Sequence, residues 1–404
     1  MTTQTLLVTI SGEDRPGVTS TFFDAIADVG AEVMDLEQVV VRGHLTLAML
    51  LSAGDAEDRL GSVLNSVGRD LDLTVKINVG TGDSIRRRTG RAAVVVLGSP
   101  LRASGVAAIT ARIASHGANI DRIRRLSRYP VTTVEFEVSG ADVDRLRREL
   151  ALESSVHSLD IAVAAGGLAR RGRRLVVMDV DSTLIQDEVI ELLASHAGRE
   201  AEVAAVTAAA MRGELDFAES LRERVAALEG LPVTVLEEVR AAIQFTPGAR
   251  TLVRTLKRLG FTVAIVSGGF IEIVEDLARE LDIDHAHANR LEVRDGILTG
   301  RLVGDIVDRA GKAAALRRFA AEAGLPLSRT VAIGDGANDL DMLEAAGLGV
   351  AFNAKPVVRE HADTAVNVPY LDAVLYLLGI TREEIEEADE ADGTPTPAPP
   401  IPTP

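Results

Sequence analysis

Two acidic residues, separated by one position, directly follow a short run of apolar residues. Asp179 and Asp181 lie in the segment Val176-Val-Met-Asp-Val-Asp-Ser-Thr-Leu184. Such a run is typical of a strand buried in a parallel sheet, and these sheets carry their sites at the carboxyl ends of the strands. One carboxylate of such a pair can attack phosphorus while the other donates and accepts a proton. The same Asp/Ser/Thr cluster could also cap a helix.

A second carboxylate cluster follows the apolar run Val331–Ile333. Asp335 comes directly after Gly334, and Asn338 and Asp339 follow within a few residues. Mg²⁺ binds few carboxylates and completes its coordination with phosphate oxygens and water. The sequence therefore predicts Mg²⁺ as the cofactor, with Asp335 among its ligands.

A third strand end could bind phosphate. Ser267, Gly268 and Gly269 follow the run Val263–Val266 and offer a hydroxyl and two backbone N–H groups, which suits phosphate at a helix N-terminus. Lys312, in a later helix-opening segment, could neutralise phosphoryl charge. Each segment could also be an ordinary turn, cap or solvated lysine, but four such sites after strand ends argue against coincidence.

The elements that must position these residues begin at Leu175, where short apolar runs start to alternate with long helical stretches. Strands without polar alternation are buried on both faces, which indicates a doubly wound parallel sheet. Between about 188 and 245 only helical patterns occur, so we expect a helical cap after the first strand. The predicted fold class is α/β, a Rossmann-like parallel sheet over 174–382, with a disordered acidic and Pro-rich tail at 383–404.

The first 165 residues contain two copies of one small α+β pattern. Each copy predicts strand, helix, strand, strand, with helices at Val18–Val29 and about 106–115. We therefore expect domains at 1–82 and 90–165, and a Gly/Arg-rich linker at 166–174. A nucleic-acid-binding patch is the alternative interpretation of that linker.

Together the polar motifs resemble those of the haloacid-dehalogenase (HAD) superfamily. Similarity to its phosphoserine phosphatases covers about 174–378, including Asp-Val-Asp-Ser-Thr-Leu-Ile-Gln-Asp-Glu188, Thr246-Pro-Gly and Ala288-Asn-Arg-Leu. The resemblance implies that Asp179 is the nucleophile and Asp181 the general acid and then base. It also implies Mg²⁺ on the Asp179 and Asp335 side chains and the Asp181 main-chain carbonyl. Around the phosphoryl group, metal and substrate it places Ser267, Gly268, Lys312, Asn338 and Asp339.

The same resemblance implies how the substrate is recognised, with Glu188 facing an ammonium group and Arg224 a carboxylate. A zwitterionic amino acid needs one charge of each sign, and Arg binds carboxylates bidentately. From the residue pattern alone, Glu188 could be one of several acids that open a helix, and Arg224 part of a solvated helix face. The resemblance places Met211 and Phe217 in the cap over the substrate, although composition alone favours core positions.

The N-terminal copies resemble ACT domains, which are β-α-β-β-α-β modules that sense amino acids. In the first copy the loop Asp14-Arg-Pro-Gly17 fits the effector loop, so Asp14 and Gly17 are the predicted effector-binding residues. The second copy has Leu101-Arg-Ala-Ser-Gly105 there instead. The resemblance implies a homodimer through the ACT domains and feedback by an amino acid, with serine as the natural candidate. A purely structural dimerisation module is the alternative.

The composition of the chain limits the classes of partner and of catalysis that we expect. The 404 residues carry a formal net charge of −17 and no cysteine, which argues against nucleic acid as the main partner and against thiol catalysis. We expect no secretory signal, because no basic residue precedes the first short apolar run, and no apolar stretch reaches the about 18 residues that span a bilayer. We therefore expect a cytoplasmic location and no membrane partner.

The combined prediction is a Mg²⁺-dependent phosphatase of the last step of serine biosynthesis. It would hydrolyse O-phospho-L-serine through an aspartyl-phosphate intermediate. The alternatives are a HAD phosphatase for another small phosphomonoester, or an amino-acid-sensing regulatory protein with a vestigial hydrolase.

Overall fold

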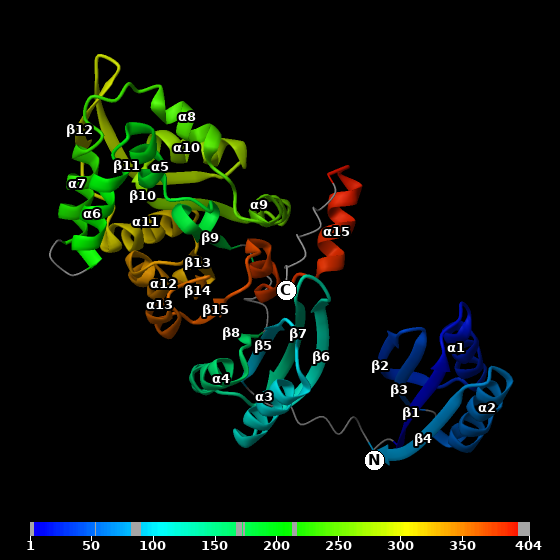
Figure 1. Cartoon of the computed structure of the whole chain (residues 1–404). Coiled ribbons are helices and arrows are strands. Elements are labelled where there is room, and N and C mark those ends of the chain that lie inside the picture. The colour runs from blue at the N-terminus through cyan, green and yellow to red at the C-terminus, as the bar shows by residue number, and fades with distance from the viewer. Residues whose placement is uncertain are drawn as a thin grey trace. The chain divides into compact units, whose positions relative to one another are not determined.

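The computed structural model describes residues 4–52, 54–81, 90–166, 172, 174–211 and 216–394 (Figure 1). Most of the predicted linker, the Met211 side chain and residues 395–404 lie outside this set. The chain divides into two units, Met1–Arg87 and Arg88–Pro404. Among the described residues, no helix combines the length and apolarity needed to cross a bilayer.

The first unit is one βαββαβ repeat with an antiparallel sheet in the order β2-β3-β1-β4. Leu6, Val8 and Ile10 alternate along β1 and enter a core shared with Phe22. The predicted helix at 18–29 is confirmed, and it ends because Gly30 adopts a left-handed conformation with φ 76°. The elements are β1 (Gln4–Glu13), α1 (Val18–Val29), β2 (Glu32–Val41), β3 (His44–Ser52), α2 (Glu57–Asp70) and β4 (Thr74–Thr81).

The second unit begins with a second copy of this repeat, whose sheet order is β6-β7-β5-β8. Ala92, Val94 and Val96 of β5 pack beneath its own helices. Val95 and Leu97, on the opposite face, belong to the core of the following domain. The elements are β5 (Arg91–Gly98), α3 (Ala103–Ser115), β6 (Asn119–Ser127), β7 (Thr132–Ser139), α4 (Val143–His157) and β8 (Asp160–Ala165).

The rest of the second unit, residues 174–394, is called the α/β domain below. Its seven-stranded sheet has the order β12-β11-β10-β9-β13-β14-β15, in which only β12 runs antiparallel to its neighbour. The strands are β9 (Leu175–Met178), β10 (Thr262–Phe270), β11 (His285–Arg294), β12 (Ile297–Val303), β13 (Thr330–Gly334), β14 (Leu348–Phe352) and β15 (Thr364–Val366).

Helices cover both faces of this sheet, as the uninterrupted apolar strands predict. Leu175 and Val177 of β9 enter the core beside α11 and α12, while Val176 and Met178 enter the core beside α9, α10 and α14. The helices outside the cap are α9 (Ala249–Arg258), α10 (Ile271–Glu280), α11 (Arg309–Glu322), α12 (Leu340–Ala345), α13 (Pro356–His361), α14 (Val374–Leu377) and α15 (Arg382–Ala391). The predicted fold class is confirmed.

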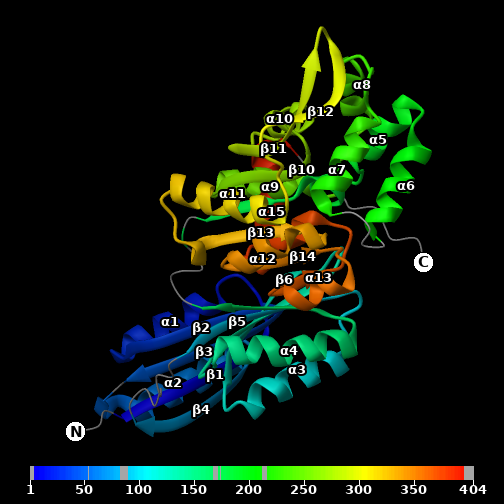
Figure 2. The same ribbon diagram turned by 90° about the vertical axis from the view of Figure 1, so that its left-hand side faces the viewer.

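The predicted cap consists of α5 (Val189–Ala197), α6 (Glu200–Met211), α7 (Phe217–Ala226) and α8 (Val235–Ala242). Figure 2 shows these helices gathered beside the hairpin of β11 and β12, and the Gly230 N–H donates to Leu298 O of β12 at 3.0 Å. This hairpin was not predicted, although Asp295-Gly296 between two strand-like runs is a hairpin signal.

The predicted disordered tail is wrong over its first part, because Arg382–Ala391 forms helix α15. Thr381 and Glu384 form a capping box at its start. Asp389 is fully buried and receives hydrogen bonds from Arg254 and Arg258 of α9. These ion pairs join α15 to α9. The acidic composition of the segment alone predicts disorder there.

Candidate active site

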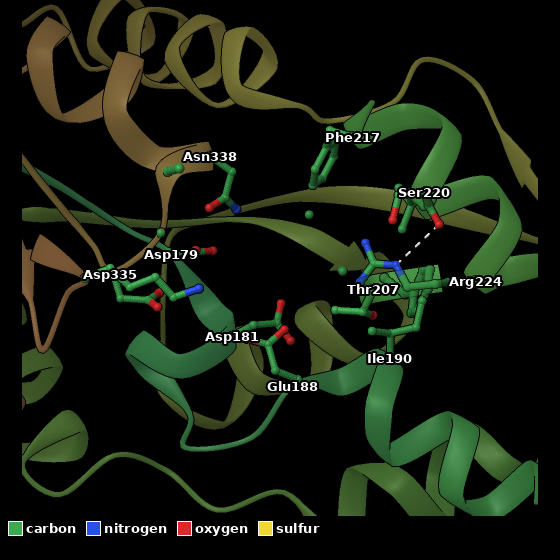
Figure 3. A pocket seen from close by; sticks show the side chains of 17 residues that line it. Asp179, Asp181, Glu188, Ile190, Thr207, Phe217, Ser220, Arg224, Asp335 and Asn338 are labelled. Atoms are coloured by element: carbon green, nitrogen blue, oxygen red, sulfur yellow. Dashed lines mark hydrogen bonds between the residues drawn. The ribbon is translucent and has the colours of Figure 1, made fainter. Parts of the chain in front are cut away.

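A cavity of about 460 Å³ lies where the carboxyl ends of β9, β10 and β13 face the cap helices (Figure 3). It brings together residues that are far apart in the sequence, because the parallel strands all end at this edge. The predicted site residues that line it are Asp179, Asp181, Glu188, Phe217, Arg224, Gly268, Gly269, Asp335 and Asn338.

Lys312, Asp179 and Asp339 form a buried ionic cluster at the base of the cavity. Lys312 Nζ lies 2.7 Å from Asp179 Oδ2 and 2.7 Å from Asp339 Oδ1. Burial raises the pKa of Asp179, and the Asp339 carboxylate adds to this while Lys312 opposes it. Burial alone would lower the pKa of Lys312, but the two carboxylates raise it above its ordinary value. Lys312 therefore stays charged beside the candidate nucleophile.

The carboxylates of this region fit a divalent cation. Asp179, Asp335 and Asp339 each offer an oxygen atom, all within 4.8 Å of one another. Burial, and secondarily Asp339, raises the pKa of Asp335 to about 6. The three carboxylates therefore repel one another, and a bound cation would offset this repulsion. Both Asp339 oxygens are already engaged, by Lys312 Nζ and by the Gly336 N–H. Asp179 Oδ1 also accepts, from the Val180 N–H at 2.7 Å, and Asp335 Oδ1 accepts from Thr183 Oγ1 at 3.2 Å. Each carboxylate oxygen keeps a further lone pair that a cation with hard oxygen ligands could use.

The Asp181 carboxylate is not part of that group of three carboxylates. Its Oδ1 accepts from the Val189 N–H at 2.8 Å, and its Oδ2 accepts from Ser267 Oγ at 2.9 Å. Ser267 Oγ in turn accepts from the Gly269 N–H at 2.7 Å. A Cβ on Gly269 would lie 2.9 Å from Ser267 Oγ, so the loop requires glycine there. Of the predicted metal ligands, Asp181 can thus contribute only through its main chain in this conformation.

Glu188 and Arg224 supply opposite charges at the cap side of the cavity, and Figure 3 shows both side chains pointing into it. Ser182, in a left-handed conformation with φ 55°, donates from Oγ to Glu188 Oε1 at 2.8 Å. Burial, and then the Asp181 carboxylate, raises the pKa of Glu188 to about 7. Burial also lowers the pKa of Arg224, an effect that Glu188 and Asp181 oppose.

The cap approaches the Ser267–Gly269 loop at Phe217. A Cβ on Gly268 would lie 3.2 Å from Phe217 Cζ, so the cap approaches the loop closely. Phe217 opens α7, whose start is fixed by a capping box between Asp216 and Glu219.

Several lining residues were not predicted. Lys355 follows β14, the strand next to β13, and shares the cavity wall with Asp335 and Asn338. The rule that selected the other strand ends would have found it, because β14 contains a recognised apolar run, Gly349–Ala351. Thr207, Ile190 and Ser220 come from the cap helices, where no sequence signal separates them from ordinary helix residues.

The predicted effector residues belong to the first unit. The Asp14 N–H donates to Gly43 O at 2.8 Å, and Gly17, with φ 95°, is the N-cap of α1. The structure thus places both in the loop between β1 and α1, and their binding role stays a prediction.

Comparison with known families gives the same three-part organisation. Residues 176–344 match haloacid dehalogenase-like hydrolases, and residues 4–78 and 90–164 each match ACT domains. A solved HAD family hydrolase from Salmonella enterica aligns with a TM-score of 0.62 at 28% identity, covering 71% of this chain and 98% of that one.

Full-length similarity extends across both repeats and the α/β domain. A phosphoserine phosphatase from Streptomyces coelicolor is 62% identical over 387 residues, which is 95% of this chain and 94% of that protein. A phosphoserine phosphatase from Mycobacterium tuberculosis is 52% identical over 396 residues, 96% of each chain. The chain belongs to the phosphoserine phosphatase family of HAD hydrolases with two N-terminal ACT domains.

Proposed function

We propose that this protein hydrolyses O-phospho-L-serine to L-serine and phosphate, the last step of serine biosynthesis. The observation that carries this proposal is that Glu188 and Arg224 line the same cavity as Asp179 and Asp181. The first pair suits the ammonium and carboxylate of a free amino acid, and the second suits phosphoryl transfer. The named relatives described above support the same substrate.

The reaction divides into two displacements at phosphorus. Asp179 attacks the phosphorus atom, and the bond from phosphorus to the serine oxygen breaks as Asp181 transfers a proton to that oxygen. Water then attacks the aspartyl phosphate, Asp181 accepts a proton from the water, and the Asp179 carboxylate is regenerated. Splitting one difficult hydrolysis into two steps is the benefit of a covalent intermediate.

The loop Ser267–Gly269 and Lys312 would stabilise the charge that develops on the phosphoryl oxygens. Lys312 is already placed within 2.7 Å of Asp179, so it needs little reorganisation when the reaction starts. Asn338 lines the cavity on the same side as Asp335 and would contact the phosphoryl group or the metal.

Magnesium is the proposed cofactor, held by the Asp179 and Asp335 side chains and the Asp181 main-chain carbonyl. When bound, Mg²⁺ would neutralise phosphoryl charge and orient the phosphate for in-line attack. The proximity of three carboxylates within 4.8 Å supports a cation here.

The ACT repeats would regulate the enzyme and form a homodimer, with an amino acid, serine being the candidate, bound near Asp14 and Gly17. The first repeat leaves apolar side chains on its sheet open to solvent, since Val39, Val41 and Val79 are 48%, 64% and 60% exposed. Exposed apolar surface of this kind favours association with another sheet.

Replacing each member of the aspartate pair tests the proposed chemistry. Asp179→Asn should abolish phosphate release from phosphoserine, and Asp181→Asn should nearly abolish it, because one loses the nucleophile and the other the proton carrier. Phosphate release is measured with Mg²⁺ over a panel of phosphorylated amino acids, with and without added serine. Full activity in either variant would refute the role proposed for the replaced aspartate. Equal activity of the wild type on all the phosphorylated amino acids would refute phosphoserine as the specific substrate.

A further inference from the structure

Asn289 of β11 does not line the cavity, yet its side chain is bonded to two segments that do carry site residues. The residue is 2% exposed. Its Nδ2 donates to Gly268 O at 2.8 Å, and its Oδ1 accepts from the Val307 N–H at 2.7 Å. Since one neighbour is a carbonyl and the other an N–H group, both ends of the amide are satisfied in one orientation only.

The first bond controls a peptide group of the phosphate-binding loop. In a planar trans peptide the C=O and N–H groups point in opposite directions. Holding the Gly268 carbonyl therefore directs the Gly269 N–H, which donates to Ser267 Oγ at 2.7 Å. Ser267 Oγ donates in turn to Asp181 Oδ2. The orientation of the loop is thus set from behind the cavity wall.

The second bond controls the start of α11. Val307 directly precedes Asp308, the N-cap residue, whose side chain accepts from the Gly311 N–H. The Lys312 N–H donates to Asp308 O at 2.9 Å, so Lys312 lies in the turn that this cap begins. Asn289 therefore fixes the spacing between the glycine loop and the lysine.

We propose that Asn289 is a positioning residue for phosphoryl binding, because it joins the Ser267–Gly269 loop to the turn that carries Lys312. The inference rests on the proposed function, in which these two segments hold the phosphoryl oxygens. The amino-acid end of the substrate would contact Glu188 and Arg224 instead, so Asn289 should affect one end of the substrate and not the other.

Two substitutions of Asn289 disrupt its two hydrogen bonds in different ways. Asn289→Asp keeps an acceptor for the Val307 N–H but sets an oxygen against the Gly268 carbonyl. Asn289→Ala removes both bonds and adds no charge. Asn367→Ala is the control. Asn367 also donates from Nδ2, to Asp160 Oδ1 at 2.6 Å, but it is exposed and lies at the contact with the second repeat.

The readout is the binding of inorganic phosphate and of serine by calorimetry in the presence of Mg²⁺, together with turnover of phosphoserine. We expect both Asn289 variants to bind phosphate about tenfold more weakly and to lose about 10- to 100-fold in kcat, with serine affinity unchanged. Asn367→Ala should match the wild type in all three measurements.

A loss of folded protein alone would lower the number of binding sites without changing either affinity, so the affinities separate positioning from stability. Unchanged phosphate affinity in a folded Asn289 variant, or equal weakening of phosphate and serine, would overturn the proposal. If one variant does not fold, the other provides the same comparison. Failure of the wild type to hydrolyse phosphoserine would refute the proposed function, while the phosphate titration would still test Asn289.

Discussion

Lys312 Nζ lies midway between two buried carboxylates, 2.7 Å from Asp179 Oδ2 and 2.7 Å from Asp339 Oδ1. The side chains of Lys312 and Asp339 are completely buried, and that of Asp179 is 5% exposed. Burying an unpaired charge is costly, so Lys312 stabilises the fold by pairing with both carboxylates. It also lies beside the proposed nucleophile, so one residue affects both stability and catalysis.

Lys312→Met should therefore impair both properties. We expect kcat for phosphoserine to fall about 10²- to 10³-fold, the cost of losing one donor to developing charge. The unpaired Asp179 and Asp339 should also lower the free energy of unfolding by about 3–5 kcal/mol. Single-turnover phosphate release and urea denaturation measure the two effects. A variant with normal turnover would contradict the assigned role of Lys312.

Glu188→Ala and Arg224→Ala should each raise the KM for phosphoserine by about 10- to 100-fold, because each removes a charged hydrogen-bond partner of the amino acid. Arg222 is exposed on α7, the helix that also carries Arg224, and provides the matched control for Arg224. Arg222→Ala should leave the KM unchanged. The same variants are assayed with p-nitrophenyl phosphate, which has no ammonium or carboxylate. An equal effect on both substrates would count against the amino-acid contacts.

The pH dependence should reveal Glu188, whose pKa is raised to about 7 by burial and by Asp181. A raised carboxyl pKa means that Glu188 is ionised above about pH 7 and becomes neutral below it, where it no longer attracts an ammonium group. The ratio of kcat/KM between wild type and Glu188→Gln should therefore fall by about tenfold from pH 8 to pH 6. Taking the ratio cancels the titration of the substrate phosphate. A ratio independent of pH would show that another group binds the ammonium.

Removing divalent cations with EDTA should abolish turnover, and added Mg²⁺ should restore it, since the buried carboxylates need a cation to approach a phosphate dianion. Asp335→Asn should weaken Mg²⁺ binding in calorimetry. Asp341→Asn is the control, because Asp341 pairs with Arg309 outside the cluster. Full turnover in EDTA would contradict the cofactor proposal.

Helix α15 should contribute to folding through Asp389. Asp389→Ala leaves Arg254 and Arg258, whose side chains are 25% and 22% exposed, without this buried carboxylate. The change should cost about 1–3 kcal/mol in the free energy of unfolding. Glu387, exposed on the same helix, is the control, and Glu387→Ala should change stability by less than about 0.5 kcal/mol. Equal denaturation midpoints for the two variants would show that the helix is dispensable.

The catalytic half of the fold could be predicted because its residues follow buried strands. Asp179, Ser267 and Asp335 each come directly after an apolar run, and parallel topology carries them to one edge. The apolar runs at β9, β10, β13 and β14 also predicted a parallel sheet, and the helical patterns between about 188 and 245 predicted the cap. Lys355 also follows an apolar run, Gly349–Ala351, and lines the cavity, but it was not predicted.

What could not be predicted depends on contacts between distant segments. Asp389 and Arg254 are 135 positions apart in the sequence. The residues around Asp389 therefore give no indication that it pairs with an arginine. Asn289 is similar, because its importance depends on Gly268 and Val307, which approach it only when β10, β11 and α11 are packed together.

The shared core of the second repeat has a practical consequence for expression. Val95, Leu97 and Val131 of that repeat pack in one core with Leu375 and Tyr376, and Thr364 Oγ1 donates to Ile161 O at 3.0 Å. A fragment starting near residue 174 would cut through this core and should be prone to aggregate. A fragment starting near residue 90 keeps it whole, so it is the smaller piece suited to crystallisation of the catalytic machinery.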